Sequence, residues 1–316
     1  MSLLSFAFAI FILILGAHFL VNGASALAKR LGVAEIVIGL TVVAFGTSTP
    51  EFVVSMFSGL GSHHDMVYGN VIGSNIFNIL LILGISGLIF PLRVQHNTVW
   101  KEIPFSLLAV VLLFVLVNDA LLYDSDVNVL SRADGTILFM TFIIFLVYVF
   151  IISRVKSADV LFVEEYSVIK TICWIIIGFA ALFLGGKLAV DNAVLIARQI
   201  GVSEKLIALT LVAGGTSLPE LATSAVAAYK RRCDMAIGNI VGSNVFNIYF
   251  ILGIGSVIRG TLYDTTLNID LIVLFFSTLV LFLTMFTGNT RRLDRWEAAI
   301  FLMGYVSYLL YVIGRK

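Results

Sequence analysis

The sequence predicts an all-α integral membrane protein in which ten transmembrane helices form two inverted five-helix repeats. Three observations support this: the composition, a series of long apolar runs and an internal repeat. Of the 316 residues, 60% are apolar and 12% are charged, against roughly 45–50% and about 25% in soluble domains. This composition argues against a soluble enzyme. The net charge of +1 provides no basic surface for nucleic acid.

The apolar runs have the length that a bilayer requires. A hydrocarbon core about 30 Å thick is crossed by roughly 20 apolar residues in a helix. The runs lack the alternating pattern of a lipid-spanning β-barrel. The predicted spans are 3–28, 35–58, 66–90, 102–120, 135–153, 169–196, 204–228, 235–258, 269–287 and 296–313. The first run lacks a basic n-region and a cleavage site, so we interpret it as a span and not as a removed signal peptide.

The basic residues between the spans predict the orientation. Lysines and arginines concentrate in the loops that lie inside when the N-terminus lies outside, as in 230–232 and 291–295. We therefore expect both termini outside and a multi-pass protein of the cytoplasmic membrane. The two cysteines, Cys173 and Cys233, have no metal-ligand spacing and are expected to be packing residues.

An internal repeat organises the chain. Residues 39–84 align without a gap with residues 208–253, at a shift of 169, and 23 of 46 positions are identical. The identities concentrate in Gly, Asn, Ser, Thr, Pro and Glu, which a shared apolar bias does not explain. We predict a first repeat over 1–153, a short cytoplasmic linker over 154–167 and a second repeat over 168–316. Because five is odd, the second copy enters the membrane from the opposite side, which makes the repeat inverted.

A GTS-x-PE motif interrupts one span of each copy, at 46–51 and at 215–220. Pro50 and Pro219 cannot donate a helical hydrogen bond, so both helices should break in the middle of the membrane. Glu51 and Glu220 lie beside the breaks, where a carboxylate is costly unless it is paired. Neither motif contains a Lys or Arg. A bound cation or a proton is the remaining counter-charge.

The following span of each copy contains the motif GN-xx-GSN-x-FN. Asn70, Ser74 and Asn78 are spaced by four, as are their counterparts Asn239, Ser243 and Asn247, so each set lines one helix face. The glycines of the motif allow another helix to approach closely. Carboxylate, amide and hydroxyl oxygens without Cys or His form a hard-oxygen site suited to Ca²⁺.

At these residues the sequence resembles the cation/calcium antiporter superfamily, specifically the prokaryotic sodium/calcium exchangers. GTSTPE with GSNIFN and GTSLPE with GSNVFN match both repeats of that family, and the size agrees along essentially the whole chain. The resemblance implies a secondary active antiporter that exchanges Ca²⁺ against Na⁺ by alternating access, in which the first and sixth helices slide past an eight-helix core. It implies no cofactor and no protein partner.

The resemblance also implies roles for individual residues. Glu51 and Glu220 would bind Ca²⁺, and Thr47 and Thr216 would add backbone oxygens. The implied auxiliary or Na⁺ sites comprise Ala44, Ser48, Ser74, Ala213, Ser217 and Ser243, with Asn78 and Asn247 at the central polar position. Some family members carry Asp at the place of Asn247, whereas this site has two formal negative charges, which balance one Ca²⁺, two Na⁺ or two H⁺. An H⁺/Ca²⁺ antiporter is therefore the alternative, and a cation channel a more distant one.

Other polar residues have simpler interpretations. Asn70 and Asn239 are expected to join helices and not to touch an ion. The loop at 63–65 is expected to be a solvated turn. Lys187 and Asp191, four apart on the sixth span, are expected to form an internal ion pair or to extend toward the membrane surface.

Overall fold

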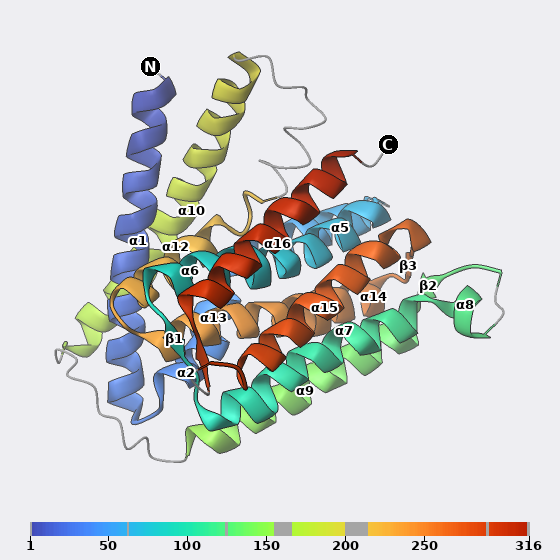
Figure 1. Cartoon of the computed structure of the whole chain (residues 1–316), viewed down its shortest axis with the longest axis horizontal. Helices are drawn as coiled ribbons and strands as arrows, with labels where there is room; N and C mark the ends of the chain where they lie inside the picture. Colours follow the sequence, from blue (N-terminus) through green and yellow to red (C-terminus); the bar gives the residue numbers. More distant parts are fainter. Residues whose placement is uncertain are drawn as a thin grey trace.

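Two long helices, α1 (Ser2–Leu31) and α10 (Val168–Gln199), lie against each other and stand across the rest of the molecule (Figure 1). Their contact depends on glycine. A Cβ atom added to Gly16 would lie 2.8 Å from the backbone nitrogen of Leu182, and one added to Gly185 would lie 2.8 Å from that of Leu13. The 30 residues of α1 extend about 45 Å at 1.5 Å each, which is longer than a hydrocarbon core about 30 Å thick.

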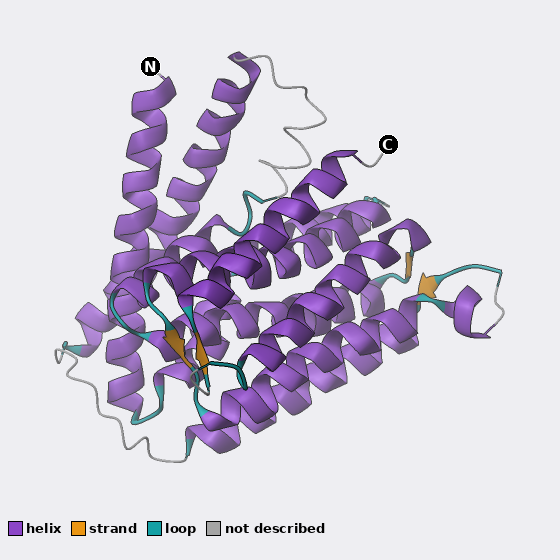
Figure 2. Ribbon diagram, in the orientation of Figure 1, coloured by secondary structure: helices purple, strands orange, loops and turns teal. Residues whose placement is uncertain are grey.

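The computed structural model describes residues 2–61, 63–123, 126–154, 166–199, 214–288 and 291–314. Helices dominate this part of the chain, and the strands in it are two residues long (Figure 2). The elements between α1 and α10 are α2 (Glu35–Ile38), the π-helix η1 (Gly39–Val43), α3 (Ala44–Thr47), α4 (Thr49–Leu60), α5 (His64–Ile76), the π-helix η2 (Phe77–Ile82), α6 (Leu83–Ile89), β1 (Leu92–Arg93), the π-helix η3 (Thr98–Glu102), α7 (Ile103–Val117), α8 (Asp119–Tyr123), β2 (Val129–Leu130) and α9 (Arg132–Ser153). The elements after α10 are α12 (Leu218–Tyr229), α13 (Cys233–Val245), the π-helix η5 (Phe246–Leu252), α14 (Gly253–Ile258), β3 (Thr261–Leu262), the 3₁₀ helix η6 (Thr265–Leu267), α15 (Asn268–Thr284), β4 (Arg292–Leu293) and α16 (Arg295–Gly314).

Within the described residues, eight helices are long and apolar enough to cross a membrane, and the count is nine if the bent pair Glu35–Thr47 and Thr49–Leu60 is taken as one span. These segments correspond to nine of the ten predicted spans. The first part of the other predicted span, 204–228, lies outside the described residues, and its second part is α12. The chain is therefore an all-α, multi-pass membrane protein, as predicted. The tenth span and the inverted orientation of the repeats stay predictions.

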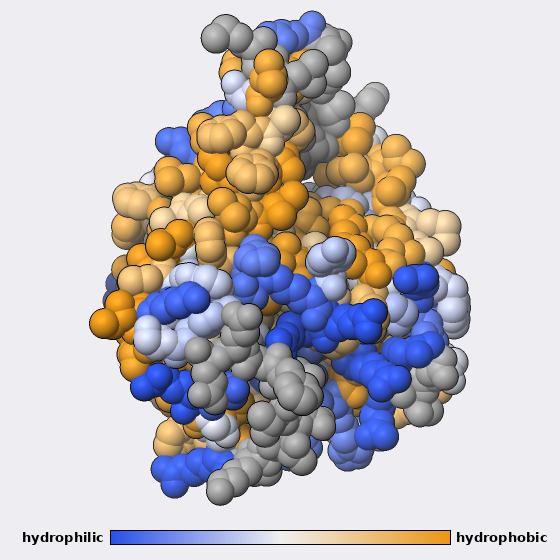
Figure 3. All heavy atoms as spheres, turned by 90° about the vertical axis from the view of Figure 1, so that its left-hand side faces the viewer, coloured by the Kyte–Doolittle hydropathy of each residue, from blue (hydrophilic) through white to orange (hydrophobic). Residues whose placement is uncertain are grey.

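The surface of the helices is apolar where lipid would contact it. Phe8, Phe11 and Ile14 of α1 are more than half exposed. Figure 3 shows hydrophobic side chains gathered over the upper part of one face, with hydrophilic side chains over its lower part. A soluble protein rarely exposes so large an apolar area, whereas a bilayer stabilises it.

Two continuous helical segments form the centre of the molecule. His64–Ile89 and Cys233–Ile258 have 72% and 78% of their apolar windows buried, against 17–39% in the other described spans. Both contain the GSN-x-FN motif. The motif therefore lies where protein surrounds it on all sides and lipid does not.

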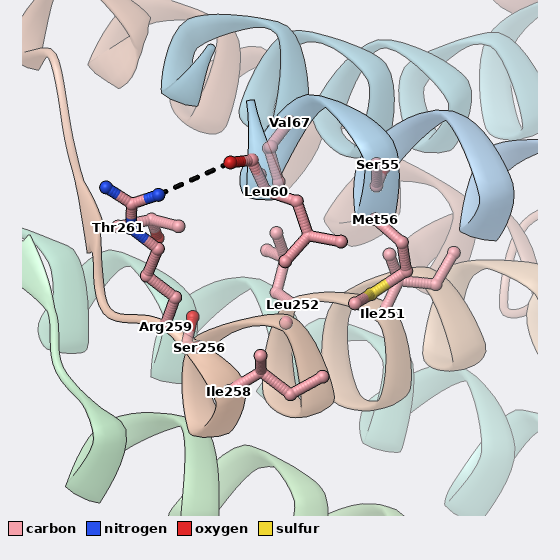
Figure 4. Close-up of a pocket in the computed structure, with 12 residues that line it drawn as sticks. Ser55, Met56, Leu60, Val67, Ile251, Leu252, Ser256, Ile258, Arg259 and Thr261 are labelled. Atoms are coloured by element: carbon pink, nitrogen blue, oxygen red, sulfur yellow. Dashed lines mark hydrogen bonds between the residues drawn. The ribbon is translucent and has the colours of Figure 1, made fainter. Parts of the chain in front are cut away.

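Short contacts at the helix ends join the two halves of the sequence. Leu92 of β1 pairs with Leu293 of β4, and Val129 of β2 pairs with Leu262 of β3. Figure 4 shows a further contact, in which the Arg259 guanidinium donates a hydrogen bond of 3.3 Å to the Leu60 carbonyl at the end of α4. The negative end of the α4 helix dipole also stabilises a cation at this position.

Candidate ion-binding site

In both GTS-x-PE motifs a helix begins directly after the serine. Ser48 separates α3 from α4 with φ −83° and ψ 8°, and the two helical parts are bent by 47°. Ser217, which precedes α12, has nearly the same backbone angles, φ −88° and ψ 8°. Pro50 and Pro219 lie in the first turn of the following helices, where a missing N–H costs no helical hydrogen bond. The break predicted in the first motif is confirmed, and its bend lies at Ser48, two residues before Pro50. In the second motif a turn at 214–217 precedes α12, and the segment before residue 214 lies outside the described residues, so a break of that helix stays a prediction.

The two carboxylates lie in the first turns of α4 and α12, and each is only 1% exposed. Ser217 Oγ donates a hydrogen bond of 2.8 Å to Glu51 Oε1, and Ser48 Oγ donates one of 2.8 Å to Glu220 Oε1. Each serine therefore contacts the carboxylate of the other half. Ser74 Oγ adds a longer bond of 3.4 Å to Glu51 Oε1. These bonds bring both helix breaks and both carboxylates together at one place.

Several buried oxygens of the two carboxylates and of the two GSN-x-FN motifs have no hydrogen-bond partner among the described residues. They come from both helix breaks and from both GSN-x-FN motifs. The atoms are Glu51 Oε2, Glu220 Oε2, Asn78 Oδ1, Asn247 Oδ1 and Ser243 Oγ. A buried oxygen without a partner is costly, and a hard cation is the ligand that satisfies many oxygens at once. No three His, Cys, Asp or Glu side chains of the described residues form a metal cluster, so the neutral oxygens must complete any coordination shell.

Four asparagines at the crossing of the central helices orient the amide oxygens. Asn75 and Asn244 donate to each other's backbone carbonyls at 3.2 and 3.3 Å. Asn78 Nδ2 donates to Asn244 Oδ1 at 3.0 Å, and Asn247 Nδ2 donates to Asn75 Oδ1 at 2.9 Å. Since these bonds use the NH₂ groups of Asn78 and Asn247, their unpartnered atoms are the carbonyl oxygens.

Asn75 and Asn244 were missed as functional candidates in the sequence. The two residues hold the same position in the two copies of the motif, which could have identified them. The spacing of four selected only the other polar residues of the motif. Their roles depend on a contact between residues 169 positions apart, which no local pattern reveals.

The first asparagine of each motif joins helices, as expected. Asn70 Nδ2 donates to Ser55 Oγ at 2.8 Å and to the Glu51 carbonyl at 3.0 Å. Asn239 Nδ2 donates to Ser224 Oγ at 2.9 Å, and its Oδ1 accepts a hydrogen bond of 3.1 Å from Thr47 Oγ1. These bonds hold each carboxylate-bearing helix against the next helix of its own half and against the break of the other half.

The glycines of the second motif allow the close approach that this geometry requires. A Cβ added to Gly242 would lie 2.8 Å from the Leu40 Cα and carbonyl oxygen, and one added to Gly238 would lie 2.9 Å from the Ile36 carbonyl. The segment 201–213, which aligns with the helix containing Leu40, lies outside the described residues. The corresponding prediction for Gly69 and Gly73 stays a prediction.

The remaining predicted site residues surround the breaks. Eight of the predicted residues are buried, and each lies at a break or on one of the two central segments. They are Ala44, Thr47, Ser48, Ser74, Asn78, Ser217, Ser243 and Asn247. Thr216 is half-buried, and its hydroxyl lies 3.5 Å from Asn70 Oδ1. Ala213 lies outside the described residues. The described residues of the predicted site are therefore buried, apart from the half-buried Thr216.

The sodium/calcium exchanger protein family matches this chain over residues 1–151 and 170–314. The chain belongs to the sodium/calcium exchanger family. It is 36% identical over 307 residues to the putative antiporter CaxA of Alkalimonas amylolytica, with 94% of each chain covered. It is 31% identical over 339 residues to the sodium/calcium exchanger MaX1 of Methanosarcina acetivorans, again with 94% of each covered.

Solved structures extend this similarity to the fold. The sodium-calcium exchanger NCX_Mj, soaked with zero Na⁺ and Ca²⁺, superposes with a TM-score of 0.83 at 33% identity, and 98% of each chain is covered. The family consists of secondary transporters, so this exchanger is a transporter and not an enzyme. Family and fold together support a cation/Ca²⁺ antiporter.

Proposed function

We propose that this protein exchanges Ca²⁺ for Na⁺ across the cytoplasmic membrane by alternating access. The observation that carries the proposal is the pair Glu51 and Glu220, buried together from the two halves of the chain, each with one unpartnered oxygen. Two negative charges are balanced by one Ca²⁺ or by two Na⁺. Because both ions require the same carboxylates, binding of one excludes the other, and exchange follows.

The proposed roles of the individual residues are those that the family resemblance implies. Glu51 and Glu220, with the backbone oxygens of Thr47 and Thr216, bind Ca²⁺. The auxiliary Na⁺ positions use oxygens from Ala44, Ser48, Ser74, Ala213, Ser217 and Ser243. Asn78 and Asn247 occupy the centre, where their unpartnered amide oxygens suit a cation and not an anion.

The neutral oxygens favour Na⁺ over H⁺ as the coupling ion. A proton binds to one oxygen and is shared with a second oxygen through a hydrogen bond. The two carboxylates alone would provide both oxygens. A metal cation needs several oxygens to replace its water shell. The buried oxygens of Asn78, Asn247 and Ser243 have a function in Na⁺ exchange that H⁺ exchange would not require.

We further propose a ten-helix protein of two inverted repeats with both termini outside, in which α1 and α10 move together. The glycine-mediated contact between these helices supports their motion as a pair. Sliding of the pair would expose the site first to one side of the membrane and then to the other.

The test is Ca²⁺ uptake into proteoliposomes that contain the purified protein, with the membrane potential clamped. An outward Na⁺ gradient should drive saturable Ca²⁺ uptake, while an outward H⁺ gradient without Na⁺ should not. Uptake driven by H⁺ alone would refute Na⁺ coupling. Ca²⁺ entry that needs no counter-ion on the opposite side would refute an antiporter and indicate a channel.

A further inference from the structure

A cavity of about 480 Å³ lies between α4, α10 and the turn before α12. Thr49 and Pro50 of α4 form one wall, and Thr216 and Pro219 form another. Phe183 and Gly186 belong to the third wall, on α10. The cavity therefore borders both helix breaks.

The cavity is lined by residues that lie next to both carboxylates in the chain. Pro50 and Pro219 directly precede Glu51 and Glu220 in the chain, and Thr216 directly precedes the serine that donates to Glu51. In the proposed orientation, the parts of α4 and α10 that line the cavity beyond the breaks run toward the outside.

Two charged side chains line the cavity in addition to its apolar walls. Of the described residues that form it, Lys187 and Asp191 are the ionisable ones. Both belong to α10 and are exposed, and their spacing of four places them on one helix face. The ion pair expected between them is not formed in the described chain.

We propose that Lys187 and Asp191 set the electrostatic potential of this cavity and thereby the ratio in which Ca²⁺ and Na⁺ reach the site. The inference rests on the proposed Na⁺/Ca²⁺ exchange. Lys187 repels cations and Asp191 attracts them, and apolar walls of low dielectric strengthen both effects. Because the two charges oppose each other, the cavity admits Na⁺ but does not raise the local Ca²⁺ concentration as far as Asp191 alone would.

This mechanism predicts a fixed relation between the two ions. The energy of an ion in a potential is proportional to its charge, so a change that alters local Na⁺ by a factor n alters local Ca²⁺ by n squared. A structural disturbance has no reason to obey this relation. The relation therefore separates an electrostatic role from a packing role.

The experiment measures half-saturating Ca²⁺ and Na⁺ concentrations from each membrane face in proteoliposomes. In Lys187→Met, the half-saturating concentration measured from the face at which α10 ends should fall about threefold for Na⁺ and about ninefold for Ca²⁺. The half-saturating concentrations measured from the other face should stay unchanged. Asp191→Asn should raise both values with the same squared relation. High choline chloride should reduce all these shifts, since it screens the charges.

Lys170→Met is the matched control, because Lys170 is a lysine of the same helix at its opposite end, over the Tyr166 and Trp174 rings. It should leave both concentrations unchanged. Lys187→Glu provides a second variant with a larger shift in the same direction. Equal fold-changes for both ions, equal changes from both faces, or no change would overturn the inference. Absence of Na⁺-driven Ca²⁺ uptake in the parent protein would instead reject the proposed function.

Discussion

Replacement of either site carboxylate by its amide should abolish Ca²⁺ transport while the protein stays folded. Glu51→Gln and Glu220→Gln keep the side-chain length and an oxygen that accepts the hydrogen bond from Ser217 or Ser48. Each substitution removes one unit of charge from the site, and each of the two carboxylate side chains is only 1% exposed. The loss therefore acts mainly on ion binding and not on packing.

The magnitude follows from Coulomb's law. A unit charge about 4 Å from another contributes about 4 kcal/mol at an effective dielectric near 20, and about 8 kcal/mol for a divalent ion. Desolvation of the carboxylate offsets several kcal/mol of this. A remainder of about 3 kcal/mol corresponds to a loss of Ca²⁺ affinity of at least about a hundredfold.

Titration calorimetry and radioactive Ca²⁺ flux in proteoliposomes measure this loss, and thermal unfolding in detergent reports the fold. Glu102→Gln is the matched control: Glu102 is also 1% exposed, has one unpartnered oxygen and accepts a hydrogen bond from Tyr148, but lies in another span. This variant should transport Ca²⁺ normally. Normal flux in either site variant, or an equal loss in the control, would refute the assignment.

Three further predictions concern the surroundings of the site. Asn75→Ala or Asn244→Ala should weaken ion binding about tenfold or more, as each removes a bond that orients an amide oxygen of the site, and calorimetry on the folded variant checks this; unchanged affinity would contradict the orienting role. Asn247→Asp, with or without Asn78→Asp, adds a carboxylate and should make transport more dependent on Na⁺ or pH and alter the charge moved per cycle; currents identical to the parent would show that these asparagines only pack. Burial and the nearby Arg232 lower the pKa of Lys230, whose ammonium contacts Asn22 of α1, to about 8; since the unfolded chain then binds more protons, thermal stability should rise between about pH 8 and 10, and Lys230→Met should lack this rise.

The sequence alone determined the class of protein and led to the proposed chemistry of its site. Apolar runs long enough for a bilayer are a local property, and so is the effect of Pro50 or Pro219 on a helix. The repeat marked the same residues twice, which separated Glu51 and Glu220 from residues that only pack. Residue type is sufficient for such inferences, because a carboxylate in the membrane requires a counter-charge wherever its neighbours lie.

Only the tertiary structure decided which buried oxygens of the proposed site have no hydrogen-bond partner. The bonds from Ser48 to Glu220 and from Ser217 to Glu51 join residues 172 and 166 positions apart, so they depend on how the two broken helices meet. The orientation of Asn78 and Asn247 depends in the same way on Asn244 and Asn75. The spacing of four predicted a shared helix face but could not predict what each amide group contacts. Side-chain direction at a helix crossing is set by the packing partner, and the partner of each of these residues lies in the other half of the chain.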